Sequence, residues 1–268
     1  MLRSIKDLEN YTVVASDGSV GNVKDFLFDD LTWVIRYFVV ETGTWLSNRK
    51  VLISPISLQK PNWKEKTLPA QMTTDQVKNS PDIDTDKPVS RQHEMNYLDF
   101  YGYPYYWGED CLWGVGMYPY MLYPGYTNFL YEQANPNNTH IIDDKTELEA
   151  QQNDDPNLRS CKAIIGYHIH ANDGDIGHIS GLLVEESTWA VRYFVVDTSS
   201  WWGKHNVLIS PEWIDQVQWL DCSVSVDLSR QKIQDAPEYH STEQLNHQHE
   251  QAIYEHYGLT GYWTREKK

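Results

Sequence analysis

Cysteine is scarce in this sequence, and the few cysteines form no recognisable pattern. Cys111, Cys161 and Cys222 lie far apart, and none belongs to a C-x-x-C pair. An odd number of widely spaced cysteines matches neither a disulfide framework nor a zinc-ligand spacing. The sequence therefore predicts a reducing, cytoplasmic location.

Long apolar runs and an excess of positive charge are also missing. No window approaches the roughly 18 apolar residues that a membrane helix needs, and the first residues contain no apolar run of signal-peptide length. The formal net charge is −16, and the only small basic cluster is at residues 265–268. A strongly negative protein repels phosphate backbones. We expect neither membrane insertion nor nucleic-acid binding.

Motifs that carry catalytic chemistry are absent from the sequence as well. There is no G-x-S-x-G, H-E-x-x-H or P-loop pattern. This absence favours a protein without enzymatic activity and without a cofactor. With 268 residues, 40% of them hydrophobic, the chain is long enough to form two ordinary domain cores.

What the sequence does contain is an internal repeat. A shift of 156 residues aligns Leu2 to Trp107 with Leu158 to Trp263 without a gap. Matched blocks include Asp17-Gly18-x-x-Gly21 with Asp173-Gly174-x-x-Gly177, Arg36 to Val40 with Arg192 to Val196, Val51 to Pro55 with Val207 to Pro211, His93-Glu94 with His249-Glu250, and Tyr106-Trp107 with Tyr262-Trp263. We therefore expect two equivalent domains at 1–107 and 158–268.

The segment 108–157 has no counterpart elsewhere in the chain. Its first part is rich in Tyr, Gly and Pro, and residues 143–155 are acidic and rich in Gln and Asn. The acidic part is predicted to be a linker. The aromatic part could be a docked loop, a flexible tether or a segment that recognises a partner, because exposed aromatic residues usually need a surface to bury against.

Each repeat begins with short β-rich runs. The runs 11–15 and 20–29 flank the turn at Ser16 to Ser19, and this arrangement predicts a hairpin. The next run, 33–41, is apolar on both faces and must be covered on both sides. Further strands are expected at 50–54 and 63–70. The fold class is therefore mainly β, with two tandem small barrels that are closed or nearly closed.

Short helices are predicted after each barrel. A Ser or Thr cap introduces a helical turn at 73–78 and at 229–234, and longer helices are expected at about 90–101 and 246–257. These helices are the natural cover for an apolar barrel face. We expect the two units to pack together as a pseudo-dimer.

The order of these motifs resembles the PRC-barrel family. The likeness is carried by Asp-Gly-x-x-Gly, the strand that ends at Asp29-Asp30, Arg-Tyr-Phe-Val-Val, Val-Leu-Ile-Ser-Pro and the trailing capped turn, and it covers about 1–81 and 157–237. The family includes the cytoplasmic domain of the photosynthetic reaction-centre H subunit, a domain of a ribosome maturation factor and stand-alone tandem bacterial proteins. The resemblance implies a protein-binding barrel without general enzymatic activity.

The residues proposed to contact a partner are basic or aromatic. Arg36 and Arg192 interrupt apolar strands at matching places, where each could pair with a carboxylate such as Asp29 or Glu185, or could anchor a partner. Further candidates lie in loops beside the third strand of each repeat, at Trp45, Trp201 and Trp202. These tryptophans could also pack onto the other unit.

Histidine is the residue type that would favour a metal site. His168 and His170 share one face of a predicted strand, but their repeat partners are Thr12 and Val14, and no third ligand is evident. We expect solvated strand residues there and no metal. The adjacent pairs His93-Glu94 and His249-Glu250 are expected to tie a helix to its barrel, because neighbouring residues on a helix do not face each other.

Two classes of function remain at this level. The first is a non-enzymatic adaptor that binds a protein partner, with homodimerisation possible. The second is an enzyme, metal-binding protein or small-ligand carrier with a site between the two units. A role as an accessory to membrane electron-transfer complexes follows only by analogy with the family, because fold does not determine function.

Overall fold

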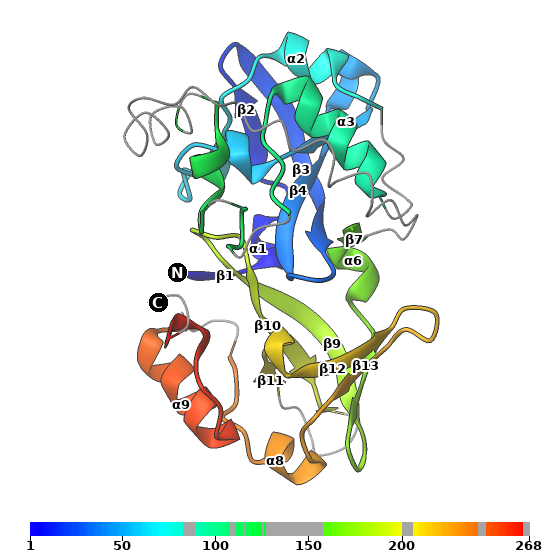
Figure 1. Ribbon diagram of the computed structural model, residues 1–268, viewed down its shortest axis with the longest axis vertical. Helices are drawn as coiled ribbons and strands as arrows, with labels where there is room; N and C mark the ends of the chain where they lie inside the picture. Colours follow the sequence, from blue (N-terminus) through cyan, green and yellow to red (C-terminus); the bar gives the residue numbers. More distant parts are fainter. Residues whose placement is uncertain are drawn as a thin grey trace, which may run out of the picture. The chain divides into compact units, whose positions relative to one another are not determined.

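The computed structural model describes residues 1–82, 89–107, 111–114, 116–124, 126, 158–199, 206–240 and 245–264. Two compact units are present, and their boundaries do not follow the order of the chain. Residues Glu9–Ser160 form one of them, which we call the continuous unit. The other, the discontinuous unit, combines Met1–Leu8 with Cys161–Lys268 (Figure 1).

In its described residues, the continuous unit contains a six-stranded sheet and the helices α2 and α3. Its elements are β2 (Thr12–Ala15), β3 (Gly18–Asp29), β4 (Val34–Glu41), η1 (Gly43–Leu46), β5 (Lys50–Ile53), η2 (Pro55–Ser57), β6 (Thr67–Pro69), α2 (Thr74–Asn79), α3 (Arg91–Tyr101), η3 (Pro119–Leu122) and β7 (Leu158–Ser160). The strand order is β5-β4-β3-β2-β6, and β7 pairs with β3. Strands β2 to β5 lie where the hydrophobic pattern predicts strands.

The discontinuous unit repeats this plan with a seven-stranded sheet. Its elements are β1 (Leu2–Ser4), α1 (Ile5–Leu8), α6 (Cys161–Ile164), β8 (His168–Ala171), β9 (Gly174–Glu185), β10 (Val191–Asp197), β11 (Asn206–Ile209), η5 (Pro211–Trp213), β12 (Ile214–Gln218), β13 (Ser223–Val226), α8 (Arg230–Gln234), α9 (His247–Tyr257) and η6 (Tyr262–Thr264). The strand order is β11-β10-β9-β8-β13-β12, and β1 pairs with β9.

The core of each sheet is the strand that is apolar on both faces. Every residue of β4 except Glu41 is buried, and the same holds for β10 except Asp197. On one side of β4, the ring of Tyr37 packs edge-on against Tyr97 of α3, with 4.9 Å between the ring centroids. The Tyr97 hydroxyl also donates to the carbonyl oxygen of Leu52 on β5. Helix α3 therefore covers this part of the sheet.

Helix boundaries follow local capping signals. Thr73 caps α2 through a reciprocal capping box with Gln76. The longer helices α3 and α9 end at Gly102 and Gly258, whose φ values of 68° and 69° are the left-handed conformation that glycine adopts without strain.

The sequence predicts barrels that are closed or nearly closed, and among the described residues no closed barrel is found. In the described residues both sheets are open paths that end at a short strand on each side, and no ladder joins β5 to β6. Strand β6 has only three residues and continues into isolated bridges, Leu58 with Ala70 and Asn62 with Thr67. Such a short strand offers too few backbone groups to close a twisted sheet. The fold is mainly β, with two open sheets.

The first strand of each repeat belongs to the sheet of the other repeat. Strand β1, at the start of the first repeat, pairs with β9 of the second; strand β7, at the start of the second repeat, pairs with β3 of the first. Both pairings are antiparallel. Each unit thus contains one strand that the repeat pattern assigns to the other.

Candidate functional site

A buried arginine lies within a cluster of polar side chains in the continuous unit. Arg36 is in the middle of β4, and only 1% of its surface is exposed. An unpaired guanidinium amid apolar neighbours would be very costly, so its surroundings must supply hydrogen-bond acceptors and aromatic faces.

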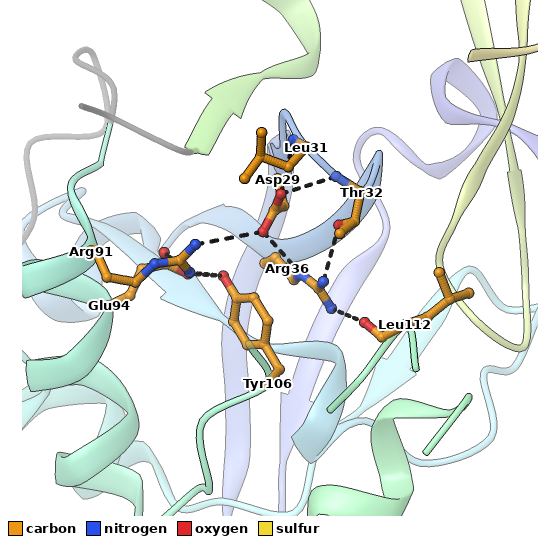
Figure 2. A network of polar contacts seen from close by, with 8 residues as sticks. All are labelled: Asp29, Leu31, Thr32, Arg36, Arg91, Glu94, Tyr106 and Leu112. Carbon is orange, nitrogen blue, oxygen red and sulfur yellow. Dashed lines mark hydrogen bonds and ion pairs between the residues drawn. The ribbon is translucent and has the colours of Figure 1, made fainter. Parts of the chain in front are cut away.

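Two aromatic rings pack against the Arg36 guanidinium. The guanidinium carbon lies 3.8 Å from the ring centroid of Tyr106 and 4.6 Å from that of Trp113. Its Nη1 donates to the carbonyl oxygen of Leu112 at 2.7 Å, and Nη2 donates to the Thr32 hydroxyl at 3.1 Å (Figure 2). Ring contacts and hydrogen bonds from both terminal nitrogens therefore hold the group in place.

Two of these partners come from the segment that has no counterpart in the second repeat. Trp113 has no exposed surface, and its ring also contacts Tyr106, with 6.0 Å between the centroids. The described part of the aromatic insert is thus docked onto the unit through the Arg36 guanidinium. This is the docked-loop arrangement among the three that composition leaves open.

Carboxylates complete the cluster. Glu94 of α3 accepts hydrogen bonds from the Tyr106 hydroxyl and, at 2.9 Å, from Nη1 of Arg91. The Asp29 carboxylate at the end of β3 lies 4.0 Å from Nε of Arg36 and 3.9 Å from Nη2 of Arg91. The expected pairing of Arg36 with Asp29 is therefore a weak ion pair with a long N–O distance. It belongs to a larger network, which Figure 2 shows.

Burial dominates the electrostatics of this network. It raises the pKa of Glu94 to about 7, against the lowering effect of Arg91. It also lowers the pKa of Arg36, against the opposite influence of nearby Tyr106 and Asp29. Desolvation disfavours the charged form of both groups.

The discontinuous unit contains an equivalent cluster at the positions that the repeat predicts. Nε of Arg192 donates to the Glu185 carboxylate at 2.9 Å, and its guanidinium carbon lies 3.9 Å from the ring centroid of Tyr262. The Tyr262 hydroxyl donates to Glu250 at 2.9 Å. These residues correspond, in order, to Arg36, Asp29, Tyr106 and Glu94.

The two clusters differ in how their acids are held. Burial raises the pKa of Glu185, but the ion pair with Arg192 and hydrogen bonds outweigh it, so that the pKa lies below its usual value. Burial raises the pKa of Glu250. The second repeat has His247 at the position equivalent to Arg91. Glu250 also accepts from the Tyr193 hydroxyl at 3.1 Å.

The Arg36 cluster is enclosed within the continuous unit. Arg36 and Glu94 are each only 1% exposed. An open groove of about 470 Å³ in the same unit is lined instead by neutral residues, among them Met72, Gln76 and Tyr123. The cluster therefore holds β3, β4, α3 and the insert together.

The proposed tryptophan contacts are only partly within the described residues. Trp45 is 41% exposed, and its indole N–H donates to the carbonyl oxygen of Val20 at 2.7 Å. Trp201 and Trp202 lie outside the described residues. Arg36 and Arg192 are buried, with 1% and 8% of their surface exposed, and both are engaged within their own units.

The two histidines considered as metal ligands, His168 and His170, both lie on β8. His168 lies directly opposite His178 in the β8–β9 ladder, and His170 contacts the Asp175 carboxylate. Across the part of the chain that the structure describes, no three His, Cys, Asp or Glu side chains gather as a metal ion requires.

The paired His-Glu sequences separate the two side chains. In both repeats the histidine, His93 or His249, is exposed, whereas the glutamate, Glu94 or Glu250, is buried in the cluster. Glu250 accepts a hydrogen bond from Tyr193 of β10 and so ties α9 to the sheet, whereas Glu94 accepts hydrogen bonds from Arg91 of its own helix and from Tyr106.

Several residues of the clusters were not singled out from the sequence. Tyr106 and Tyr262 were noted only as repeated positions, although identity between repeats was itself the available signal. Trp113 offered no such signal, because the insert occurs once.

Residues 2–66 match the model of the PRC-barrel domain. The matched PRC-barrel domain includes Leu2–Ser4, which the structure places in the discontinuous unit. It ends before α2 and α3, so Glu94 and Tyr106 lie beyond it. No curated protein is similar enough to match this chain.

Membrane association through a spanning helix finds no support in the structure. None of the helices in the described ranges combines the length and the apolar character that crossing a bilayer requires.

Proposed function

We propose that this chain is a non-enzymatic scaffold that binds a protein partner and contains two PRC-type domains. Support for a second domain comes from the gapless repeat, which projects residues 2–66 onto 158–222. The strand registers agree as well: β1 meets β9 at the same relative positions at which β7 meets β3.

The observation that carries the binding proposal is a group of exposed tyrosines on the docked insert. Tyr118, Tyr120 and Tyr126 are 38%, 47% and 40% exposed. The rings of Tyr118 and Tyr120 stack with 5.5 Å between centroids, and Tyr126 meets Tyr120 edge-on at 5.6 Å. We call these three residues the tyrosine surface.

An exposed aromatic group of this kind has the properties of an interaction surface. Tyrosine is enriched at interfaces, because it offers a large apolar ring and a polar hydroxyl at low cost in conformational entropy. The electron-rich ring faces attract Arg and Lys, and the net charge of −16 draws in basic surfaces. The partner class proposed here is a protein with a basic contact patch.

Quantitative affinity capture from the native cell extract tests this proposal. The baits are the wild-type chain, the double variant Tyr118→Ser/Tyr120→Ser and the control Trp45→Ser, which removes a different exposed aromatic residue. We expect the double variant to capture at least about tenfold less of one specific protein than the wild type does. This difference corresponds to about 1.4 kcal/mol of binding free energy. The Trp45→Ser variant should retain it.

The stability of each bait is checked by thermal unfolding, so that a loss of capture is not a loss of folding. Capture that is equal for all three baits would contradict the tyrosine surface as the binding site. Capture lost only with Trp45→Ser would move the site to the loop beside β4.

A further inference from the structure

The edge of β9 that accepts β1 is an interaction surface for an eight-residue segment, Met1–Leu8, which reaches it from a distant part of the sequence. We propose that this edge also accepts the Leu2–Ser4 strand of a second copy of the chain, giving a strand-exchanged dimer. This inference does not depend on the tyrosine surface.

The two donor strands are interchangeable in sequence. Leu2-Arg3-Ser4 and Leu158-Arg159-Ser160 consist of the same three residues. Their acceptor positions also correspond: Leu2 pairs with Glu185 and Leu158 with Asp29, which are equivalent in the repeat. Because donor and register are the same, the backbone ladder alone cannot tell one donor from another.

Equivalent ion pairs accompany the two ladders. Nε of Arg3 lies 2.6 Å from the carboxylate of Glu186, and Nε of Arg159 lies 2.9 Å from that of Asp30. Glu186 and Asp30 are again equivalent positions. The charge pattern therefore favours an arginine-bearing strand at either edge without specifying which copy supplies it.

The two strands are not held equally. Leu158 is fully buried and forms a bridge with Val89 on its other side, whereas Leu2 is partly exposed. The Ser160 hydroxyl donates to the Asp25 carboxylate at 2.5 Å, and the position equivalent to Asp25 at the β9 edge is Gly181, which has no side chain to accept. Strand β1 is therefore the more easily exchanged of the two.

The connection between the exchanged segment and its own repeat is a short hinge. Helix α1 ends at Leu8 and β2 begins at Thr12, with Asn10 in the left-handed region at φ 64°. A change of backbone angles in such a hinge can send the segment to another copy, and every native contact is then reformed between chains. The cost is the effective concentration that the covalent connection provides within one chain.

Charge reversal distinguishes exchange between copies from pairing within one chain. The full-length variants Arg3→Glu and Glu186→Arg each place like charges together when β1 stays within its own chain. In an exchanged heterodimer, the glutamate introduced at position 3 of one copy meets the arginine introduced at position 186 of the other. The unaltered Arg3 and Glu186 form the second pair, so that both ion pairs are restored.

The two variants are unfolded, mixed and refolded together, and the heterodimer is quantified by native mass spectrometry. We expect about tenfold more dimer in the mixture than in either variant alone. The matched control is a mixture of Arg159→Glu with Asp30→Arg at the other edge, in which we expect no increase, because β7 is retained. Equal dimer in the test mixture and in the single variants would overturn the proposal, as would an equal increase in the control.

Should a charge-reversed variant fail to refold, the wild-type chain supplies the answer. Isotopically labelled and unlabelled wild-type chains are refolded together at high concentration, cross-linked and digested. Cross-linked peptides that join residues 1–8 of one label to β9 of the other support the exchange. Cross-links from this segment to β9 of the same label only would refute it.

Discussion

Glu94 is the residue whose charge state depends most directly on the fold. Its carboxyl is buried between Tyr106 and Arg91, and its pKa in the folded protein is about 7, compared with an ordinary value of 4.5. Since the folded pKa is the higher one, the unfolded chain loses this proton first as the pH rises. The contribution of Glu94 to stability is therefore complete below pH 4.5 and is lost as the pH rises through 7.

Replacement of Glu94 by Gln should remove this dependence. The amide keeps the shape and remains neutral, so the free energy of unfolding of Glu94→Gln should fall less between pH 4.5 and 7.5 than that of the wild type, by up to about 3 kcal/mol. Urea unfolding at several pH values measures the difference. The exposed Glu255→Gln on α9 removes the same charge and serves as the control. Wild-type behaviour of Glu94→Gln would mean that the buried carboxyl is ionised throughout this range.

At the scale of the element, the strongest sequence constraint lies in the hairpin of each repeat. A Cβ at Gly21 would lie 2.0 Å from the carbonyl oxygen of Glu41, and at Gly177 it would lie 2.0 Å from that of Asp197. At the second glycine of Asp-Gly-x-x-Gly, the backbone of β3 therefore lies very close to the end of β4, and that of β9 very close to the end of β10. Any side chain there must push the two strands apart.

Two glycines of the same motif give a matched test of this close approach. Gly21→Ala should lower the free energy of unfolding by about 3 kcal/mol, because the clash is with backbone and φ is 156°. Gly18→Ala should cost far less, because its new Cβ would lie 3.7 Å from the Thr74 side chain. Chemical denaturation of both variants measures the contrast. Similar losses in the two would indicate that the strands can separate without cost.

The elements that could be predicted are those whose signal is local. Strand β4 was evident from its two apolar faces, and α2 from its cap at Thr73. Strand β1 was missed, because three residues carry no periodicity and their partners are about 180 residues away in the sequence. A closed or nearly closed barrel was predicted from the number of strands and the need to protect their edges, and neither contains information on how far β6 extends.

The candidate site was predicted unevenly for the same reason. Arg36 and Arg192 were noticed because a charge interrupts an apolar strand, and Asp29 and Glu185 were nominated as acids for them. The packing of Trp113 onto Arg36 could not be anticipated, because the insert has no repeat partner and its docking depends on a contact across 77 residues of sequence.

At the scale of the whole molecule, the first strand of each repeat pairs with the sheet of the other repeat, so the compact units differ from the sequence repeats. The matched PRC-barrel domain starts at residue 2, whereas the compact unit that holds the rest of it starts at Glu9. Neither sheet is completed by its own repeat. The stability of β9 consequently depends on residues of the first repeat, and that of β3 on residues of the second.

A pair of leucine substitutions makes this dependence measurable. Leu2→Ala weakens β1, so amide hydrogen exchange should accelerate in residues 183–186 of β9, while residues 27–29 of β3 keep their protection, since only β9 pairs with β1. Leu158→Ala should do the reverse, with the larger effect because Leu158 is fully buried. Hydrogen exchange followed by mass spectrometry resolves the two strands. If each substitution instead loosened the strand of its own repeat, the pairing of β1 with β9 and of β7 with β3 would not exist in solution.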